Sequence, residues 1–142
     1  MGILDSLTLP VLIAPMAGGP STPALVNAAA EAGTLGFLAA GVMGVEQFQA
    51  ELAQMTGRYG INLFRPQTEE PTPSHIDELA GLLTQPFREY RLGEPRVPTV
   101  DLSNGWEEKF HLAVAARPAV ISCTFGIFSA AEFTTLKQAG IE

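Results

Sequence analysis

Short apolar segments alternate with helix-like segments along this chain, and this alternation limits what the chain can fold into. The apolar segments predict strands over Pro10–Ala14, Leu35–Ala40, Tyr59–Phe64 and Ala119–Cys123. Each segment is apolar on both of its alternating faces, which is typical of strands in a parallel sheet that helices cover. The pattern therefore predicts an α/β fold built from repeated strand–helix units.

A helical pattern follows the expected strands. Capping residues, prolines in the first turn and glycines after the last turn mark where the helices begin and end. These signals predict helices over Thr22–Ala32, Val45–Thr56, Asn104–Arg117 and Ser129–Ala139. Thr22 is expected to be an N-cap, and Asn104–Glu107 and Ser129–Glu132 resemble capping boxes.

The spacing of the strands indicates an insertion after the third one. The first three strands start at residues 10, 35 and 59, whereas the fourth starts at residue 119. The extra residues, about 65–98, contain one helical pattern, Ser74–Tyr90, which Pro86 should kink or break. Such an excursion is where α/β enzymes place substrate loops. A fifth strand is expected from Ile141.

Composition narrows the classes of function. The 142 residues are 46% hydrophobic, which is enough for one folded core, and they carry a net charge of −7. This charge argues against a nucleic-acid surface or an anionic membrane surface. Prolines and glycines interrupt the uncharged residues 6–30, so no membrane span is expected. The single cysteine, Cys123, excludes an internal disulfide and favours a cytoplasmic location.

The residues after the first expected strand, Pro15–Gly19, suggest a ligand wall. Pro15 lacks a backbone N–H and should end the strand. Gly18 and Gly19 allow the backbone to turn sharply and a flat ligand to approach it closely. The same residue types also build an ordinary strand-to-helix turn, so both interpretations stay open here.

Polar residues occur near the ends of two other expected strands. Asn62 lies between apolar neighbours, and a buried amide without partners costs about 1–3 kcal/mol. It therefore binds a ligand or is satisfied by neighbouring backbone. Ser122 and Thr124 should point to one face and Cys123 to the other, as a small buried apolar side chain.

Other signals for catalysis are weak. His75 and His111 fall on expected helices, so we assign them no catalytic role. No Cys/His spacing predicts a metal site, and the glycine motifs of dinucleotide and triphosphate sites are absent. Trp106 is expected to pack in the core rather than to stack on a ligand. Two folds fit the pattern: an open doubly wound sheet and a (β/α)8 barrel, of which 142 residues would form about half.

Three segments carry a family resemblance: "PVLIAPMAGGPSTPALVNAAAEAGTLGFLAAG", "YGINLF" and "PAVISCTFG". In this order they resemble the N-terminal half of the nitronate monooxygenase family, formerly called 2-nitropropane dioxygenases. The resemblance runs from Leu7 to Ile141 and is weakest over residues 65–98. It implies a partial TIM (β/α)8 barrel, with residues 1–142 forming the first four βα units and a helical insertion after the third strand.

The resemblance also implies a cofactor and a reaction. Family members bind FMN and oxidise alkyl nitronates with O2 to a carbonyl compound and nitrite. The positions that match the family's flavin wall and pocket are Pro15, Met16, Ala17, Gly18, Asn62 and Thr124. The family's catalytic histidine and phosphate loops match no residue up to Glu142, so we assign no catalytic residue. We expect the chain made alone to be inactive, and colourless or aggregating.

Three rival interpretations remain open. An FMN-dependent enoyl-acyl carrier protein reductase would share the flavin wall but would need NAD(P)H. A non-catalytic half-barrel would associate with itself or bind a ligand without turnover, and its oligomeric state is open. A flavodoxin-like sheet should carry more hydroxyls in its first loop than Pro15–Gly19 does.

Overall fold

The computed structural model describes residues 2–67, 69–96 and 101–142, which form two compact units. The larger unit comprises the chain up to Pro66 together with Ser103–Glu142. The smaller unit is Gln67–Leu102. Every residue proposed above for a ligand site belongs to the larger unit.

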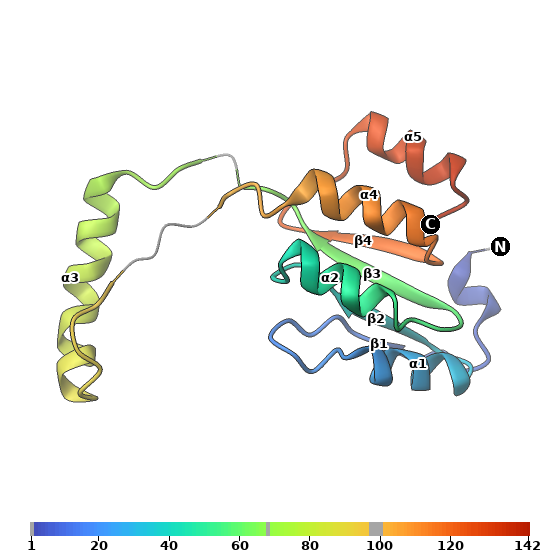
Figure 1. Ribbon diagram of the computed structural model, residues 1–142, viewed down its shortest axis with the longest axis horizontal. Helices are drawn as coiled ribbons and strands as arrows, with labels where there is room; N and C mark the ends of the chain where they lie inside the picture. The colour runs from blue at the N-terminus through green and yellow to red at the C-terminus, as the bar shows by residue number, and fades with distance from the viewer. Residues whose placement is uncertain (1, 68, 97–100) are drawn as a thin grey trace. The chain divides into compact units, whose positions relative to one another are not determined.

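A four-stranded parallel sheet forms the centre of the larger unit (Figure 1). Its strands are β1 (Leu12–Ile13), β2 (Leu35–Ala39), β3 (Tyr59–Phe64) and β4 (Val120–Thr124). They lie in sequence order, so the described sheet has no reversal of strand order of the kind that marks a doubly wound fold. The register aligns Ala39 with Asn62, and Asn62 with Ser122.

Four helices cover one face of this sheet. They are α1 (Pro23–Glu31), α2 (Val45–Leu52), α4 (Trp106–Ala116) and α5 (Ala130–Gln138). Each helix contributes at least one side chain to a single buried cluster, together with the strand residues that alternate toward the helices. The fully or almost fully buried members of this cluster include Val26, Leu38, Phe48, Ile61, Leu63, Phe110, Ile121 and Leu136.

The opposite face of the sheet has its own, smaller cluster. Leu35 and Phe37 pack there against Ile3, which lies in the 3-10 helix η1 (Ile3–Ser6). Because side chains alternate along a strand, Asn62 and Ser122 share this second face. The second face is thus apolar near the amino ends of the strands and polar near their carboxyl ends.

The chain starts a further pairing beside β4. The backbone N–H of Glu142 donates to the carbonyl of Ala119 (3.2 Å), and the N–H of Ile121 donates to the carbonyl of Glu142 (2.9 Å). These two bonds are the pattern of a parallel ladder. The expected fifth strand at Ile141 is thus represented by its first ladder contacts, although no strand is assigned there.

Two expected elements are shorter than the sequence pattern suggests. The strand expected over Pro10–Ala14 is only Leu12–Ile13, because the carbonyl of Ala14 accepts from the Ser21 hydroxyl instead of continuing the ladder. The helix expected to reach Thr56 ends at Leu52. Beyond it, the Asn27 side chain donates to the carbonyl of Gln54 and accepts from the N–H of Thr56.

The expected helix caps are confirmed at two positions and wrong at a third. Thr22 caps α1, and Ser129 and Glu132 form a capping box on α5. The capping box expected at Asn104 does not form, because α4 begins after Gly105 without a side-chain cap. Asn104 has φ +53°, and its side chain donates to the carbonyl of Gly41 (2.6 Å).

The smaller unit contains α3 (Pro73–Glu89), which Thr72 caps. The helix continues through Pro86, so of the expected kink or break at this residue the break does not occur. The missing N–H of Pro86 removes one hydrogen bond near the helix end, while its carbonyl still accepts from the N–H of Tyr90 (3.0 Å). Residue 98, where the insertion was expected to end, lies outside the described residues.

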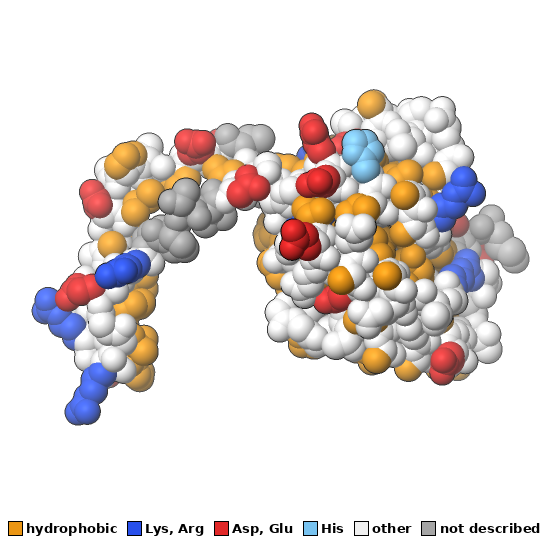
Figure 2. All heavy atoms as spheres, viewed as in Figure 1, with side chains coloured by type: hydrophobic (Ala, Val, Ile, Leu, Met, Phe, Trp, Pro, Cys, Tyr) orange, Lys and Arg blue, Asp and Glu red, His pale blue; other side chains and the backbone are white. Residues whose placement is uncertain are grey.

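The helices of the described chain are all too short or too polar to traverse a lipid bilayer. On the face of the larger unit seen in Figure 2, basic side chains occur as separate groups.

Replacing Gly60 by alanine is expected to destabilise the larger unit, because the added Cβ would lie 2.6 Å from the Phe37 ring. Overpacking of this kind costs about 1–3 kcal/mol. Urea denaturation followed by Trp106 fluorescence measures the loss. As a control, Gly60→Ala combined with Phe37→Leu should cost less than the sum of the two single changes. An unchanged midpoint for Gly60→Ala would contradict this packing.

Candidate functional site

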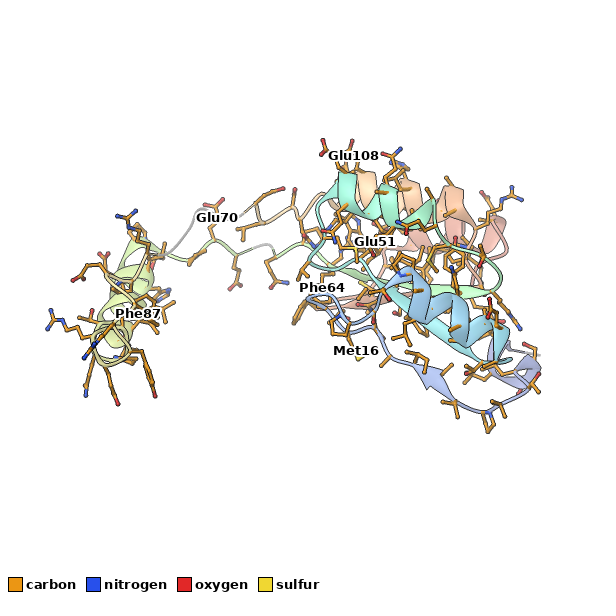
Figure 3. The ribbon with its side chains drawn as sticks, turned by 60° about the horizontal axis from the view of Figure 1, so that its bottom comes forward. Met16, Glu51, Phe64, Glu70, Phe87 and Glu108 are labelled. Carbon is orange, nitrogen blue, oxygen red and sulfur yellow. The ribbon has the colours of Figure 1, made fainter. Side chains whose placement is uncertain are left out.

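The loops that follow the four parallel strands leave from one edge of the sheet, the carboxyl edge. Met16 follows β1 and Phe64 ends β3, and Figure 3 shows both at this edge. Ligands of parallel α/β folds bind at this edge. The residues proposed from the sequence therefore lie at the end of the sheet where a ligand site is expected.

The turn after β1 has a backbone that only glycine adopts readily. Gly18 has φ +84° and Gly19 has φ +115°. Ser21, which is only 2% exposed, holds the start of the turn: its hydroxyl accepts from the N–H of Met16 (2.7 Å) and donates to the carbonyl of Ala14 (3.3 Å). Among the described residues, no acceptor takes the N–H groups of residues 17–19, which are exposed. These groups are available to a ligand.

The amide of Asn62 is buried and bonded across to β4. Its Nδ2 donates to the hydroxyls of Ser122 (2.8 Å) and Thr124 (3.1 Å), and the Thr124 hydroxyl lies 3.4 Å from its Oδ1. The partners are side chains, whereas the alternative considered from the sequence was neighbouring backbone. The amide therefore needs no ligand for its burial, and the three side chains form one neutral polar row.

The structure brings some proposed residues together and leaves others apart. Asn62 and Thr124 are in direct contact. Met16 and Gly18 line a hollow of about 290 Å³ together with Ala39, the register partner of Asn62. We call this space the loop hollow. Among the described residues, no hydrogen bond joins residues 15–19 to Asn62.

Sequence reasoning missed a charged cluster at the same edge. Arg65, directly after β3, bonds to both carboxylate oxygens of Glu132 (2.8 and 2.9 Å) and lies 4.5 Å from the centre of the Trp106 ring. The indole N–H of Trp106 also donates to Glu132 (2.7 Å). Two signals were present in the sequence. Arg65 is a charged residue directly after an apolar strand, and Glu132 is an acidic residue that the capping pattern assigned only to a helix cap.

The cluster sets the ionisation of Glu132. Burial opposes its ionisation, but hydrogen bonds from Ser129, Trp106 and Arg65 outweigh that effect and lower its pKa to about 2. Nearby, burial raises the pKa of the Cys123 thiol. Cys123 packs partly against the helix-covered core, as expected for a small apolar side chain.

A buried charge, Lys109, supports the loop after β2. Lys109 of α4 is 2% exposed, and its Nζ donates to Asn104 Oδ1 (3.1 Å) and to the carbonyl of Gly41 (3.4 Å). Asn104 donates to the same carbonyl. Gly41, Asn104 and Lys109 are not at helical spacing in the sequence, so only the structure shows that they are in contact.

The two histidines belong to different units. His75 is on α3 and His111 is on α4, and both side chains are exposed. Among the described residues, no three His, Cys, Asp or Glu side chains are grouped so that they could hold a metal ion.

Comparison with known proteins identifies the family. The family model described as nitronate monooxygenase matches residues 3–142. The chain belongs to the nitronate monooxygenase family. It is 32% identical to a probable nitronate monooxygenase of Staphylococcus aureus strain MSSA476 over 96% of its own length, and 31% identical to that of strain MRSA252. It spans only 39% of the length of these family members.

Solved structures agree with the family. The nitroalkane oxidase of Streptomyces ansochromogenes superposes with a TM-score of 0.82 at 31% identity, over 97% of this chain and 40% of the oxidase. A FabK variant from Thermotoga maritima superposes with a TM-score of 0.62 at 16% identity, over 99% of this chain and 36% of FabK. The second match shows a shared fold alone. The family member described here is thus an α/β chain with a four-stranded parallel sheet.

Replacing Glu132 by glutamine is expected to destabilise the larger unit by roughly 2 kcal/mol at pH 7, because it removes the charge that Arg65 faces. Since the folded pKa lies below the ordinary value, this stabilisation is complete above about pH 4.5 and is lost as the pH falls toward about 2. Urea denaturation across pH 2–7 measures both effects. Glu108→Gln, an exposed change on α4, is the control, and a pH-independent difference would contradict the assignment.

Proposed function

We propose that this chain forms the first four βα units of an FMN-binding (β/α)8 barrel that oxidises alkyl nitronates with O2 to a carbonyl compound and nitrite. The observation that carries the proposal is the carboxyl edge itself. It combines an uncharged strand end, a positive-φ glycine turn with open backbone N–H groups, and the neutral row of Asn62, Ser122 and Thr124.

Three features of the sheet support the partial barrel. The strands follow sequence order, and the four α-helices α1, α2, α4 and α5 pack on one face. Val11 and Leu12 at the β1 edge remain about half exposed, at 51% and 44%. Beside β4, Glu142 has begun a further ladder. Both edges of the sheet are therefore suited to additional strands, as a closed barrel requires.

The residues at the carboxyl edge fit a planar flavin ring. An added Cβ on Gly18 or Gly19 would meet no other atom within 4 Å, so the surface beside the turn is open. In our proposal, the backbone of Pro15, Met16, Ala17 and Gly18 lies against the ring, and Asn62 and Thr124 orient its polar edge. Asn62 can do this only by sharing or exchanging its bonds to β4.

The proposed reaction needs little acid–base catalysis from these residues. When bound, FMN supplies the electron acceptor for the nitronate. Asn62, Ser122 and Thr124 are neutral at physiological pH, so they can orient groups but take no proton there. A nitronate is already deprotonated at carbon, and its oxidation needs no general base. A neutral nitroalkane would need one.

The proposal also covers the cellular location and the binding partners of the enzyme. We infer a cytoplasmic location from the single cysteine, Cys123. The inferred partners are a small nitronate and O2, with no nucleic acid or membrane.

Joining this chain to the part of the Staphylococcus aureus relative that follows the matched region is expected to give a yellow protein. That protein should release nitrite from propionate 3-nitronate in air, with no requirement for NADH. Absorbance spectra and a nitrite assay measure these outcomes. A folded, colourless chimera would overturn the proposal, and rapid flavin bleaching by NADH under argon would favour the reductase instead.

In that chimera, Asn62→Ala should weaken FMN binding by about tenfold, corresponding to about 1.4 kcal/mol for one lost polar contact. Flavin fluorescence during titration of the apoprotein measures the dissociation constant. Gln138→Ala, an exposed amide change on α5, should leave it unchanged. Equal affinity of the Asn62 variant and the parent would remove Asn62 from the cofactor site.

The chain made alone is expected to be colourless or to aggregate, because the β1 edge keeps Val11 and Leu12 about half exposed and the β4 edge has only the first contacts of a further ladder. Size-exclusion chromatography with flavin absorbance tests this. A soluble yellow monomer with stoichiometric FMN would contradict it.

A further inference from the structure

Met16 differs from the other methionines that the structure describes. It is 40% exposed and borders the loop hollow (Figure 3). Met43 also borders the hollow, but Met43 and Met55 are partly buried and pack against the helix-covered core. A thioether is oxidised readily only where the oxidant can reach its sulfur. Met16 is therefore the most accessible thioether among the described residues.

The backbone around Met16 is held by groups other than its own side chain. The N–H of Met16 donates to the Ser21 hydroxyl (2.7 Å), which donates to the carbonyl of Ala14 (3.3 Å). Converting the thioether to a polar sulfoxide breaks neither of these bonds. The N–H groups of residues 17–19, for which the described residues offer no acceptor, are unused donors for a sulfoxide oxygen. The turn can therefore keep its backbone structure when Met16 is oxidised.

The single cysteine competes poorly with Met16 for an oxidant. Cys123 lies in β4 and packs partly against the helix-covered core. Burial raises the pKa of its thiol, so the side chain stays protonated at neutral pH. Peroxides oxidise the thiolate, whereas a protonated, partly buried thiol is slow to react. An oxidant at the carboxyl edge should therefore modify Met16 before Cys123.

We propose that Met16 is an oxidation site and that its sulfoxide form weakens cofactor binding at the carboxyl edge. The oxidant is hydrogen peroxide, the product of two-electron reduction of O2. The sulfur lone pair attacks one peroxide oxygen, so an S–O bond forms and the O–O bond breaks. The second oxygen leaves as water with both protons, and the peroxide gains the two electrons that the sulfur loses. A methionine sulfoxide reductase reverses the change.

Oxidation changes the chemistry of the proposed flavin wall. Met16, Ala17 and Gly18 present an uncharged surface without polar side chains. A sulfoxide in this surface is polar, and a flat ring that covers it must displace the water bound to it. The sulfoxide oxygen also competes with the ring for the N–H groups of residues 17–19. This effect on the cofactor rests on the proposed function, whereas the oxidation itself requires no flavin.

Peptide mass spectrometry after timed exposure of the chain to hydrogen peroxide tests the oxidation site. A glutamate-specific protease separates the methionines to be compared, because it cleaves after Glu31, Glu46 and Glu51. Met16 should gain oxygen at least about threefold faster than Met43 and Met55, and fragment ions distinguish it from Met1 on the first peptide. In urea the rates should become alike. Equal rates in the folded chain, or a difference that persists in urea, would overturn the proposal.

Flavin titration of the chimera described above tests the effect on the cofactor. Peroxide treatment should raise the dissociation constant of FMN at least about fivefold, and a methionine sulfoxide reductase should restore it. In the Met16→Leu chimera, the constant should be the same before and after treatment, whatever its starting value. The matched control Met43→Leu should respond as the parent does. An unchanged constant in the oxidised parent, or an equal loss in Met16→Leu, would contradict the proposed effect.

The oxidation rates are independent of the test of the reaction. If the chain precipitates, the same peptides are measured from the chimera. Selective oxidation of Met16 in a folded, colourless chimera would keep the oxidation site and reject the proposed function together with the effect on the cofactor. Nitrite release with equal oxidation of the compared methionines would keep the nitronate chemistry and reject Met16 as the oxidation site.

Discussion

The parallel pairing of β2, β3 and β4 is the constraint on which the rest of the larger unit depends. Its register places Ala39, Asn62 and Ser122 in one row on the face opposite to the four α-helices of the larger unit. A slip of one residue would turn Asn62 into the helix-covered core and expose its apolar neighbours. The polar row, the open turn after β1 and the loop hollow all take their positions from this register.

Two clusters of polar groups, one partly buried around Glu132 and one buried around Lys109, then fix the loops above the sheet. The carboxylate of Glu132 gathers Arg65, Trp106 and its own helix cap, so it joins the end of β3 to α4 and α5. Lys109 and Asn104 both bond to the carbonyl of Gly41 after β2. The charges are therefore used to hold loops, while the side chains that face the proposed ligand are neutral.

The sequence predicted elements well where one local signal decides them. The bounds of β3 are those expected, and the caps at Thr22 and Ser129 are confirmed. Prediction failed where distant residues compete for the backbone, as when Ser21 takes the carbonyl of Ala14 and Asn27 takes the backbone after α2. The hydrogen-bond partners of Asn62 could also not be predicted, because they depend on the register between two strands that lie about 60 residues apart in the chain.

The ends of the segment that carries the smaller unit are each attached to the larger unit. Arg65, just before this segment, is held by Glu132, and Asn104, just after it, is held by Gly41 and Lys109. Both of these contacts join residues of the larger unit to one another. Replacing residues 67–102 by a shorter or unrelated linker would therefore leave these two contacts in place.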